Sequence, residues 1–460
     1  MTIVRRLAMG TALCWFLLIG LVGSARAEAE QTVQLLQQYI RLDTVNPPGN
    51  EMPGAQFLAA IFERRGIPYE IVESQPGRAN IWARLRGGNQ PGLLLLHHMD
   101  VVPADTSRWS HPPFAARLVD GFVHGRGSLD NKSAGIFQLQ AFLALHAAGK
   151  PLNRDVVFMA TADEEAGGNL GVGWLWQHRP EVFDGIGAVL NEGGGGDLSN
   201  GKLSFGIEIT QKLPLWLIVK ATGMPGHGAV PRQNSAPQRL IQALAALDGL
   251  QFEARVVPIV AEYLRRIAIE APAPWDKRLR APQQLVASPK LMAELQGHDY
   301  RLHALLTNTC VVTRLRGSEK INVVPPLASA EVDCRLLPDE SAEAVLSTIR
   351  DALAGEGVTV ESVLSFGPGT SSKDNFLYKA IESALAKRYP DVLVLPKLNA
   401  GFTDSHFFRE RGISAYGFTP IILMKEESAG VHGDNESISL ENIELGDDLM
   451  RAIVTSLVYD

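Results

Sequence analysis

Histidines and carboxylates that could bind metal ions occur at several points of this 460-residue chain, each beside an apolar run or a glycine-rich turn. The first group ends the run Leu93–Asp100 (LLLLHHMD). In a strand His98 and Asp100 share one face, because alternate side chains point the same way. A histidine bound to a metal usually gives its other ring N–H to a carboxylate, which Asp100 supplies here. Taken alone, the segment favours a core histidine beside a strand-end aspartate, and the metal-site interpretation depends on residues further along the chain.

Further acidic residues and a histidine follow the same pattern. Asp130 stands in GRGSLDNK, the pair Glu164 and Glu165 follows the apolar run DVVFMAT, Glu192 precedes four glycines, and His432 lies in GVHGDNE. Each has an ordinary alternative: a helix N-cap, a solvated surface pair, a turn residue and a surface histidine. Together with His98 they supply two histidines and three carboxylates, with Glu164 left over.

Nitrogen and carboxylate ligands without cysteine suit zinc or a similar first-row metal. In a metal hydrolase the metal acidifies a water, and a nearby carboxylate accepts its proton. Glu164 and Glu165 point in different directions because they are adjacent, so that one can bind a metal while the other faces a water. The residue types therefore favour a two-metal hydrolase.

The elements that carry these residues alternate between strands and helices, which predicts an α/β domain with a mainly parallel central sheet. We expect strands over 69–73, 80–87, 93–98, 155–161 and 186–190, and helices over 30–42, 54–65, 133–148, 375–388 and 440–458. Acidic groups follow the carboxyl ends of these strands, where open α/β sheets bind their ligands.

The pattern changes near Lys212. Strands over 213–223 and 358–364, helices over 235–250 and 341–355, and strand material in 321–338 give the order strand–helix–strand–strand–helix–strand. This order predicts a small α+β sandwich inserted in the larger domain. The expected domains are 28–212 and 367–460 for the catalytic domain and 213–366 for the insertion, in which 251–317 has no regular pattern.

Composition places the chain among ordinary globular proteins, with 46% hydrophobic and 20% charged residues. The formal charge of −7 argues against a nucleic-acid binder. Residues 1–27 combine Arg5 and Arg6, an apolar run and an Ala-Arg-Ala end, which predicts a secretory signal peptide. An uncleaved anchor is the alternative, but the apolar run is short. Removing Arg5, Arg6 and Arg26 from the 43 basic residues leaves 40 against 50 acidic ones.

We therefore expect a secreted, periplasmic protein that does not bind nucleic acid and, after signal cleavage, does not bind the membrane. The mature chain keeps Cys310 and Cys334. Whether these two cysteines pair is left open, because two cysteines are not a disulfide framework.

Eight motifs in order give the chain a family resemblance. They are HHMDVVP, GRGSLDNK, TADEEAGG, NEGGGG, GHGAVP, INVVP followed by DCRLLPD, NAGFTDS and GVHGDNE. This series resembles the co-catalytic zinc exopeptidases that include aminoacylase, glutamate carboxypeptidase and yeast carboxypeptidase S. NEGGGG and TDSHFFRERGI are most similar to the carboxypeptidase S branch.

The resemblance implies two Zn²⁺ ions, with Co²⁺ or Mn²⁺ as substitutes, and it implies the following roles. His98 and Glu192 bind one ion, Glu165 and His432 bind the other, and Asp130 bridges them, with a cis bond from Asp130 to Asn131. Asp100 orients the first histidine, and Glu164 is the general base.

The inserted domain resembles the family's ferredoxin-like lid, which is often a dimer interface, so a homodimer is expected. By resemblance, His227 stabilises the oxyanion, and Arg335 binds the substrate's free carboxylate. Asn322 and the backbone at Gly401 are further candidates for holding that end of the substrate. Four more histidines near the motifs match no ligand position and are interpreted as structural: His97, His111, His124 and His406. The segment 251–317, with PAPWDKRLRAPQQ, departs from the family's compact lids.

The expected function is a secreted dinuclear zinc hydrolase that cleaves an amide bond next to a residue with a free carboxylate, as a carboxypeptidase acting on small peptides. An N-acyl amino acid hydrolase (aminoacylase) is the alternative. A catalytically inactive binding module or a solute-binding transport protein is a remote one, because neither would need Glu164 and the full ligand set.

Overall fold

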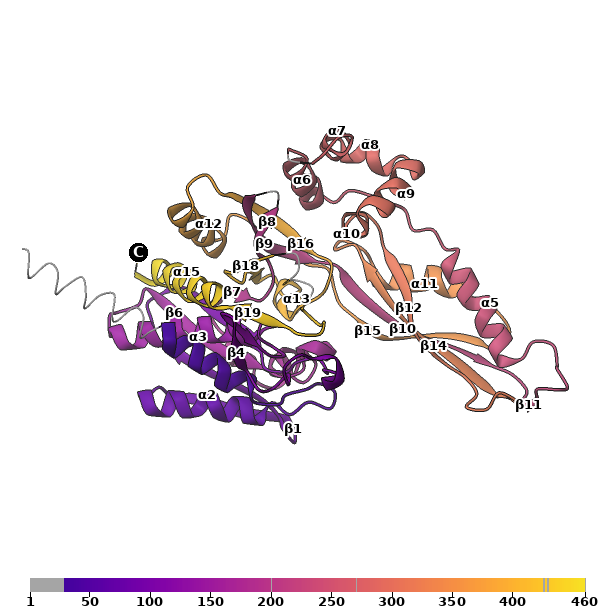
Figure 1. Cartoon of the computed structure of the whole chain (residues 1–460), viewed down its shortest axis with the longest axis horizontal. Coiled ribbons are helices and arrows are strands. Elements are labelled where there is room, and N and C mark those ends of the chain that lie inside the picture. Colours follow the sequence, from indigo (N-terminus) through magenta and orange to yellow (C-terminus); the bar gives the residue numbers. More distant parts are fainter. Residues whose placement is uncertain (1–28, 200, 270, 425–426, 428–429, 460) are drawn as a thin grey trace, which may run out of the picture. The chain divides into compact units, whose positions relative to one another are not determined.

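The computed structural model describes residues 29–199, 201–269, 271–424, 427 and 430–459, so the predicted signal peptide lies outside the described residues. The chain divides into two compact units (Figure 1). Unit 1 comprises the described residues up to Phe205, Phe376–Leu393 and those from Phe418 onward, and unit 2 comprises Gly206–Asn375 and Val394–Gly417. The predicted lid, 213–366, lies wholly within unit 2. Unit 2 extends beyond this lid and includes Val394–Gly417 as well.

The sheet of unit 1 places the carboxyl ends of three parallel strands at one edge. Its strands follow the order β1 (Tyr69–Gln75), β2 (Arg78–Leu85), β6 (Arg154–Thr161), β3 (Gln90–His98) and β7 (Ile186–Asn191). β3 is parallel to both β6 and β7, whereas β1 and β2 pair antiparallel, because a tight hairpin joins them. The sheet is therefore mixed. The leucines of β3 are fully buried, as expected of a strand covered on both faces.

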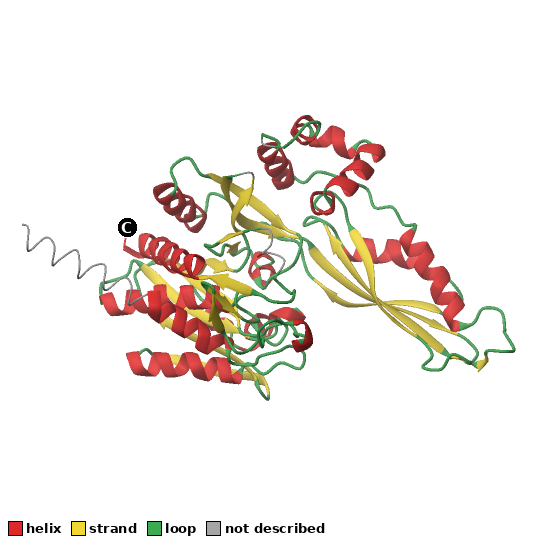
Figure 2. Ribbon diagram, in the orientation of Figure 1, coloured by secondary structure: helices red, strands yellow, loops and turns green. Residues whose placement is uncertain are grey.

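Helices flank this sheet (Figure 2). They are the helix over 29–40, α2 (Met52–Arg65), α3 (Lys132–Ala148), α4 (Val172–His178), α12 (Phe376–Arg388) and α15 (Leu440–Tyr459), and short 3₁₀ turns span Thr106–Arg108, Glu164–Ala166 and Pro180–Phe183. α3 packs against both β3 and α15. A Cβ added at Gly446 of α15 would lie 2.3 Å from the Phe137 ring of α3, so only glycine allows this close approach.

A small three-stranded sheet joins two distant parts of unit 1. β4 (Arg117–Val119), β5 (Phe122–His124) and β19 (Ser437–Ser439) pair antiparallel, with β5 in the middle. The pairing brings the loop after β5 beside the loop before β19, and these loops carry Asp130 and His432. A second long-range pair joins β8 (Gly195–Ser199) to β18 (Ile422–Leu423), and these two strands are parallel.

Unit 2 contains the predicted α+β sandwich. Its elements are β10 (Leu213–Thr222), α5 (Ala236–Asp248), β12 (Thr309–Arg316), β14 (Leu327–Leu336), α11 (Ala342–Ala352) and β15 (Val358–Ser365). The sheet order is β12-β14-β10-β15, with antiparallel pairs throughout. Alternate residues of β10, including Leu215 and Leu217, share one buried core with α5 and α11. This is a ferredoxin-like arrangement, as the sequence predicts.

The prediction that 251–317 lacks regular structure was wrong. The segment forms α6 (Pro258–Ile267), α7 (Trp275–Arg280), α8 (Pro282–Val286), α9 (Pro289–His298), α10 (Tyr300–Ala304) and then β12, the second sandwich strand. The helices share a core of their own, which includes Leu264, Trp275 and Leu295. They escape periodicity analysis because they are short, and because three begin at a proline, which the first turn of a helix tolerates.

Cys310 and Cys334 form a disulfide, which resolves the question left open by their number. The two residues lie directly opposite each other in the β12–β14 register. The remaining elements of unit 2 are β9 (Lys202–Gln211), which starts in unit 1, with its partners β16 (Leu393–Asn399) and β17 (Ser414–Gly417), then α13 (Ser405–Arg409) and the two-stranded pair β11 (Gly226–His227) and β13 (Val323–Val324). Among the described helices, none combines the length and apolar character needed to span a bilayer.

Candidate metal centre

The five predicted metal ligands lie together in unit 1, although they come from five separate segments. His98 ends β3, Asp130 precedes α3, Glu165 lies in the turn after β6, Glu192 follows β7, and His432 precedes β19. Three of these positions lie at the shared carboxyl edge of the parallel strands.

Asp130 is the centre of the cluster. Its Oδ1 lies 3.1 Å from Nε2 of His98, and its Oδ2 lies 3.0 Å from Nε2 of His432. The peptide bond from Asp130 to Asn131 is cis, as the resemblance implies. One carboxylate therefore faces a histidine on each side, which is the arrangement expected of a bridging ligand.

The other carboxylates divide between the two histidines. Oε2 of Glu192 lies 3.2 Å from Nε2 of His98, and Nδ2 of Asn131 donates to the same oxygen at 2.8 Å. Oε2 of Glu165 lies 3.1 Å from Nε2 of His432. The geometry thus gives the same two sets that the resemblance implies, one around each histidine.

Glu164 is buried beside the cluster, with its Oε2 3.9 Å from Nε2 of His98. Ligand atoms of His98, Glu164 and Glu192 lie within 4.8 Å of one another, as do those of His98, Asp130 and Glu165. The Glu164 carboxylate is therefore close enough to serve groups bound at the cluster.

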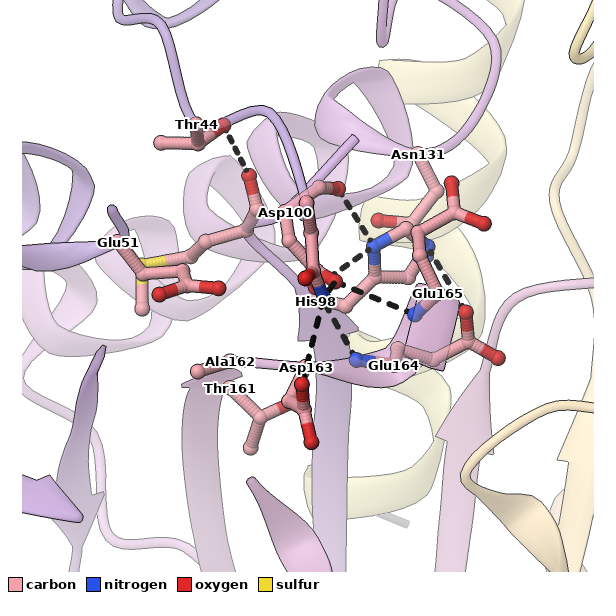
Figure 3. Close-up of polar contacts among 12 residues, drawn as sticks. Thr44, Glu51, His98, Asp100, Asn131, Thr161, Ala162, Asp163, Glu164 and Glu165 are labelled. Carbon is pink, nitrogen blue, oxygen red and sulfur yellow. Dashed lines mark hydrogen bonds and ion pairs between the residues drawn. The ribbon is translucent and has the colours of Figure 1, made fainter. Parts of the chain in front are cut away.

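Asp100 holds both the first histidine and the acidic turn (Figure 3). Nδ1 of His98 lies 2.9 Å from the backbone oxygen of Asp100 and 3.5 Å from its Oδ1. The Asp100 carboxylate also accepts the backbone N–H groups of Glu164 and Glu165, each at 3.2 Å. Asp100 is predicted to orient the histidine. It also holds the turn that carries the predicted base, Glu164.

The buried groups of the cluster shift one another's pKa values. Burial would lower the pKa of His98, but the negative Glu192 and hydrogen bonds to Asp100 and Asp130 raise that pKa well above its usual value. Hydrogen bonds to Asp130 and Glu165 raise the pKa of His432 to about 10. Burial, and then the charge of Asp130, raise the pKa of Glu165 to about 7. Several carboxylates share a buried space, so cations stabilise them.

The residues fit a pair of divalent cations. Oε1 of Glu165 is buried and has no hydrogen-bond partner among the described residues, so it has an unused acceptor inside the cluster. Imidazole nitrogens and carboxylate oxygens without thiolates suit zinc and similar ions. In two-metal sites a shared ligand holds ions about 3.5–4 Å apart, a distance that one carboxylate can span.

A buried network behind Asp100 was missed by sequence reasoning. Nδ2 of Asn46 donates to Asp100 Oδ2 at 2.8 Å and lies 3.3 Å from Oδ1 of Asp163. Arg78 donates to the same Asp163 oxygen at 2.9 Å and forms a two-bond ion pair with Glu51. The polar loop TVNPPGNE, which precedes the helix 54–65, contains Asn46 and Glu51 and is the sequence feature that could have indicated this network.

In unit 2, Arg335 is held by its own strand. Its Nε and Nη2 donate to the two oxygens of Asp333 at 2.8 and 3.1 Å, and its guanidinium lies 5.0 Å from the centre of the Phe402 ring. Nη1 of Arg335 is buried and lacks a hydrogen-bond partner among the described residues. That nitrogen is therefore a donor ready for an anion. The backbone N–H of Gly401, by contrast, already donates to Oδ1 of Asn399 at 3.0 Å.

The structure brings His227 and Asn322 together but places Arg335 apart from them. The backbone N–H of Gly228 donates to the carbonyl of Asn322 at 2.9 Å, and both turns lie at the β11 end of the sandwich (Figure 1). Arg335 pairs with Pro214 at the other end of the same sheet. Arg335 lies eight positions after Leu327, the first residue of β14, which is about 26 Å along an extended strand.

The four histidines interpreted as structural from the sequence have contacts of their own. Nε2 of His97 lies 3.1 Å from the hydroxyl of Tyr39, and burial lowers the pKa of His97 to about 3. A Cβ at Gly135 would lie 2.3 Å from that ring, so a glycine is required there. The rings of His111 and His124 contact each other, and His406 bonds to Glu410. These contacts agree with structural roles.

Comparisons with known proteins show the family of this chain. The model of "Peptidase family M20/M25/M40" matches residues 94–456. Aminoacylase-1 of Mus musculus is 28% identical over 437 residues, covering 92% of this chain and 95% of the relative. The N-fatty-acyl-amino acid synthase/hydrolase PM20D1.1 of Danio rerio is 30% identical over 367 residues, covering 76% of this chain and 69% of the relative.

Among solved structures, an M20 family metallo-carboxypeptidase from Sulfolobus solfataricus has a TM-score of 0.71 at 19% identity, covering 92% of this chain and 99% of that one. This likeness shows a shared fold. With the family model spanning most of the chain and the two histidine–carboxylate sets joined by Asp130, the chain belongs to the M20/M25/M40 family of metallopeptidases and related amidohydrolases.

Proposed function

We propose that the chain is a dinuclear zinc hydrolase that releases an amino acid with a free carboxylate from an N-acyl amino acid. The observation that carries the proposal is the Asp130 carboxylate, whose two oxygens face His98 and His432 with Glu164 alongside. The substrate class is supported by the relatives named aminoacylase and N-fatty-acyl-amino acid synthase/hydrolase.

Cleavage of the C-terminal residue from small peptides is the second candidate. The motifs NEGGGG and TDSHFFRERGI, which resemble the carboxypeptidase S branch, support it. Both reactions break an amide bond beside a free carboxylate, so the same residues serve either one.

Bound to the two histidine–carboxylate sets, divalent cations would polarise the amide carbonyl and make a water more acidic. Glu164 would accept the proton of the attacking water and pass it to the leaving amine. The N–H groups that hold Asp100 to the turn fix Glu164 beside the cluster. Arg335 would bind the substrate carboxylate, using Nη1, which its ion pair with Asp333 leaves unused.

His227 is proposed to stabilise the oxyanion of the tetrahedral intermediate, with Asn322 beside it. The separation of this pair from Arg335 along the sandwich supports a homodimer, in which the histidine serves a partner subunit. A dimer contact through β12 fits its position as an edge strand, where Val311 and Leu315 are 59% and 65% exposed. Export to the periplasm is proposed from the leader pattern of residues 1–27.

The test measures amino acid release by the chain without residues 1–27. Paired panels of N-acyl amino acids and dipeptides share the same carboxyl-terminal residue, and each is offered with zinc or with a chelator. We expect release that the chelator abolishes and that Glu164→Gln lowers by about 10²–10⁴-fold. Arg335→Lys should raise KM for these substrates and leave hydrolysis of their carboxamide analogues unchanged.

The preferred panel decides between the two candidates. Metal bound at two ions per chain without release from either panel would overturn the hydrolase proposal in favour of a binding protein. Elemental analysis of the protein purified without added metal identifies the native ion.

A further inference from the structure

We propose that Glu436 and Arg126 form a reciprocal clasp that positions Asp130 and His432 and thereby sets the affinity of the ion site between them. This inference rests on the metal centre proposed above. Neither residue touches the cluster's ligand atoms in the contacts described, so both are positioning residues.

The Glu436 carboxylate binds the backbone of the loop that carries Asp130. Its Oε1 accepts the N–H groups of Leu129 at 2.7 Å and of Asp130 at 3.1 Å. Its Oε2 accepts the N–H of Gly127 at 3.0 Å and Nη1 of Arg126 at 2.7 Å. The side chain is fully buried. Since one of the donors is the amide of Asp130, a shift of Glu436 moves the backbone of the bridging ligand.

Arg126 completes the clasp in the opposite direction. It belongs to the Asp130 loop, and its Nη2 donates to the carbonyl of Gly433 at 2.8 Å, one residue after His432. Glu436, four residues after His432, belongs to the other loop, and its own carbonyl accepts the N–H of Gly125 at 2.9 Å. One charged side chain from each loop therefore forms hydrogen bonds with the backbone of the other loop.

The chemistry requires a carboxylate at position 436. Four donors converge on two oxygens, and an ionised carboxyl group accepts at both without offering a donor. A buried charge persists only when it is paired and hydrogen-bonded, and Arg126 supplies the pairing. His432 and Asn435 have positive φ angles of 57° and 59°, a conformation that non-glycine residues adopt where the surroundings enforce it. The clasp contacts this segment within it, at Gly433, and directly after it, at Glu436.

The inference predicts a selective effect. The clasp joins the loops of Asp130 and His432, whereas the carboxylate of Glu192 and the ring of His98, on the other side of the cluster, come from strand ends. Loosening it should weaken the ion held by His432, Glu165 and Asp130 more than the ion held by His98 and Glu192, which shares only Asp130 with the clasped loops.

The test is a Co²⁺ titration of the metal-free mature protein, followed by visible absorption and by elemental stoichiometry. Glu436→Gln keeps the shape but turns one oxygen into an NH₂ group that faces N–H donors. We expect one of the two ions to bind about 10- to 100-fold more weakly, the range seen when outer partners of metal ligands are lost, with the other weakened less. Arg126→Lys keeps the charge but cannot bond to the Glu436 carboxylate and the Gly433 carbonyl through two separate nitrogens. It should weaken the same ion less than Glu436→Gln does.

Glu208→Gln is the matched control. Glu208 is a fully buried carboxylate of unit 2 that pairs with Arg409 at 3.2 Å and accepts from Asn399, neither of which is a proposed ligand. It should lower the melting temperature and leave both Co²⁺ affinities unchanged. Wild-type affinities in Glu436→Gln, or an equal loss of both ions in it and in Glu208→Gln, would overturn the inference.

If Glu436→Gln does not fold, Arg126→Lys decides by the same criterion. The titration needs no turnover, so it separates this inference from the hydrolase proposal. A wild-type protein that binds two ions but cleaves nothing refutes the hydrolase alone, and intact binding in the clasp variants refutes the clasp alone.

Discussion

The side-chain amide of Asn46 holds the carboxylate of Asp100, with Nδ2 2.8 Å from Oδ2. Asn46 belongs to the loop before α2 and stands between two carboxylates, since Oδ1 of Asp163 is 3.3 Å away. Asp100 in turn accepts the N–H groups of Glu164 and Glu165. A neutral donor between two acids thus supports the turn that carries the base.

Asn46→Ala should therefore lower kcat/KM by about 10- to 100-fold while two ions remain bound, because Asp100 loses one hydrogen bond that fixes it. Steady-state kinetics at saturating metal, with metal content measured in parallel, check this. The control is Asn442→Ala, which removes a buried asparagine bonded to the backbone of Ile422 and should cost stability without changing kcat/KM. Equal kinetic losses in the two variants would refute a specific role for Asn46.

Asp130→Asn should abolish binding of both ions at stoichiometric metal and lower kcat/KM by more than about 100-fold. The amide keeps the shape but removes the charge, and one of its two positions becomes a donor facing a histidine nitrogen. Isothermal titration with Zn²⁺ measures the loss. Retention of one tightly bound ion would show that Asp130 serves only one histidine.

Lys212 should make stability depend on pH. Burial, and then the charge of Arg335, lower the pKa of Lys212 to about 7, against an ordinary value of 10.5. Between these values the unfolded chain binds more protons than the folded one, so this lysine makes stability rise as pH increases from about 7 to about 10.5.

Lys212→Met removes that titration. It also loses the bonds from Nζ to the carbonyls of Ala304 and Thr307, at 2.9 and 2.8 Å, so the wild type should gain most over the variant at high pH, where the lysine is neutral in the folded and the unfolded chain. The difference in melting temperature between wild type and variant should widen from pH 7 to pH 10. A constant difference would contradict the low pKa.

Reduction of the disulfide should destabilise unit 2. The bond between Cys310 and Cys334 closes a loop with a sequence separation of 24, for which chain entropy gives up to about 3.5 kcal/mol. Urea unfolding with and without a reductant measures the change, and a Cys310→Ser/Cys334→Ser double variant should show the lower stability in both conditions. A reductant effect that persists in the double variant would assign the change to another cause.

The sequence by itself predicted the candidate ligand set, because its members stand in short motifs, three of them at the ends of strands. His98, Glu165 and Glu192 follow strands whose apolar runs are local signals, and parallel neighbours bring their ends to one edge. The sandwich could also be predicted, since β10, α5, β14, α11 and β15 each show the period of their own element.

Only the tertiary structure shows which residues hold those ligands in place. Glu436 and Asp130 are 306 residues apart in sequence, and Asn46 and Asp163 are 117 apart, so neither contact leaves a local pattern. The pairing of Cys310 with Cys334 depends on the register of β12 against β14. The helices of 251–317 are too short to be stable alone and form because they bury Leu264, Trp275 and Leu295 against one another. Local periodicity records what one element buries, whereas hydrogen bonds and packing between distant segments exist only after the chain has folded.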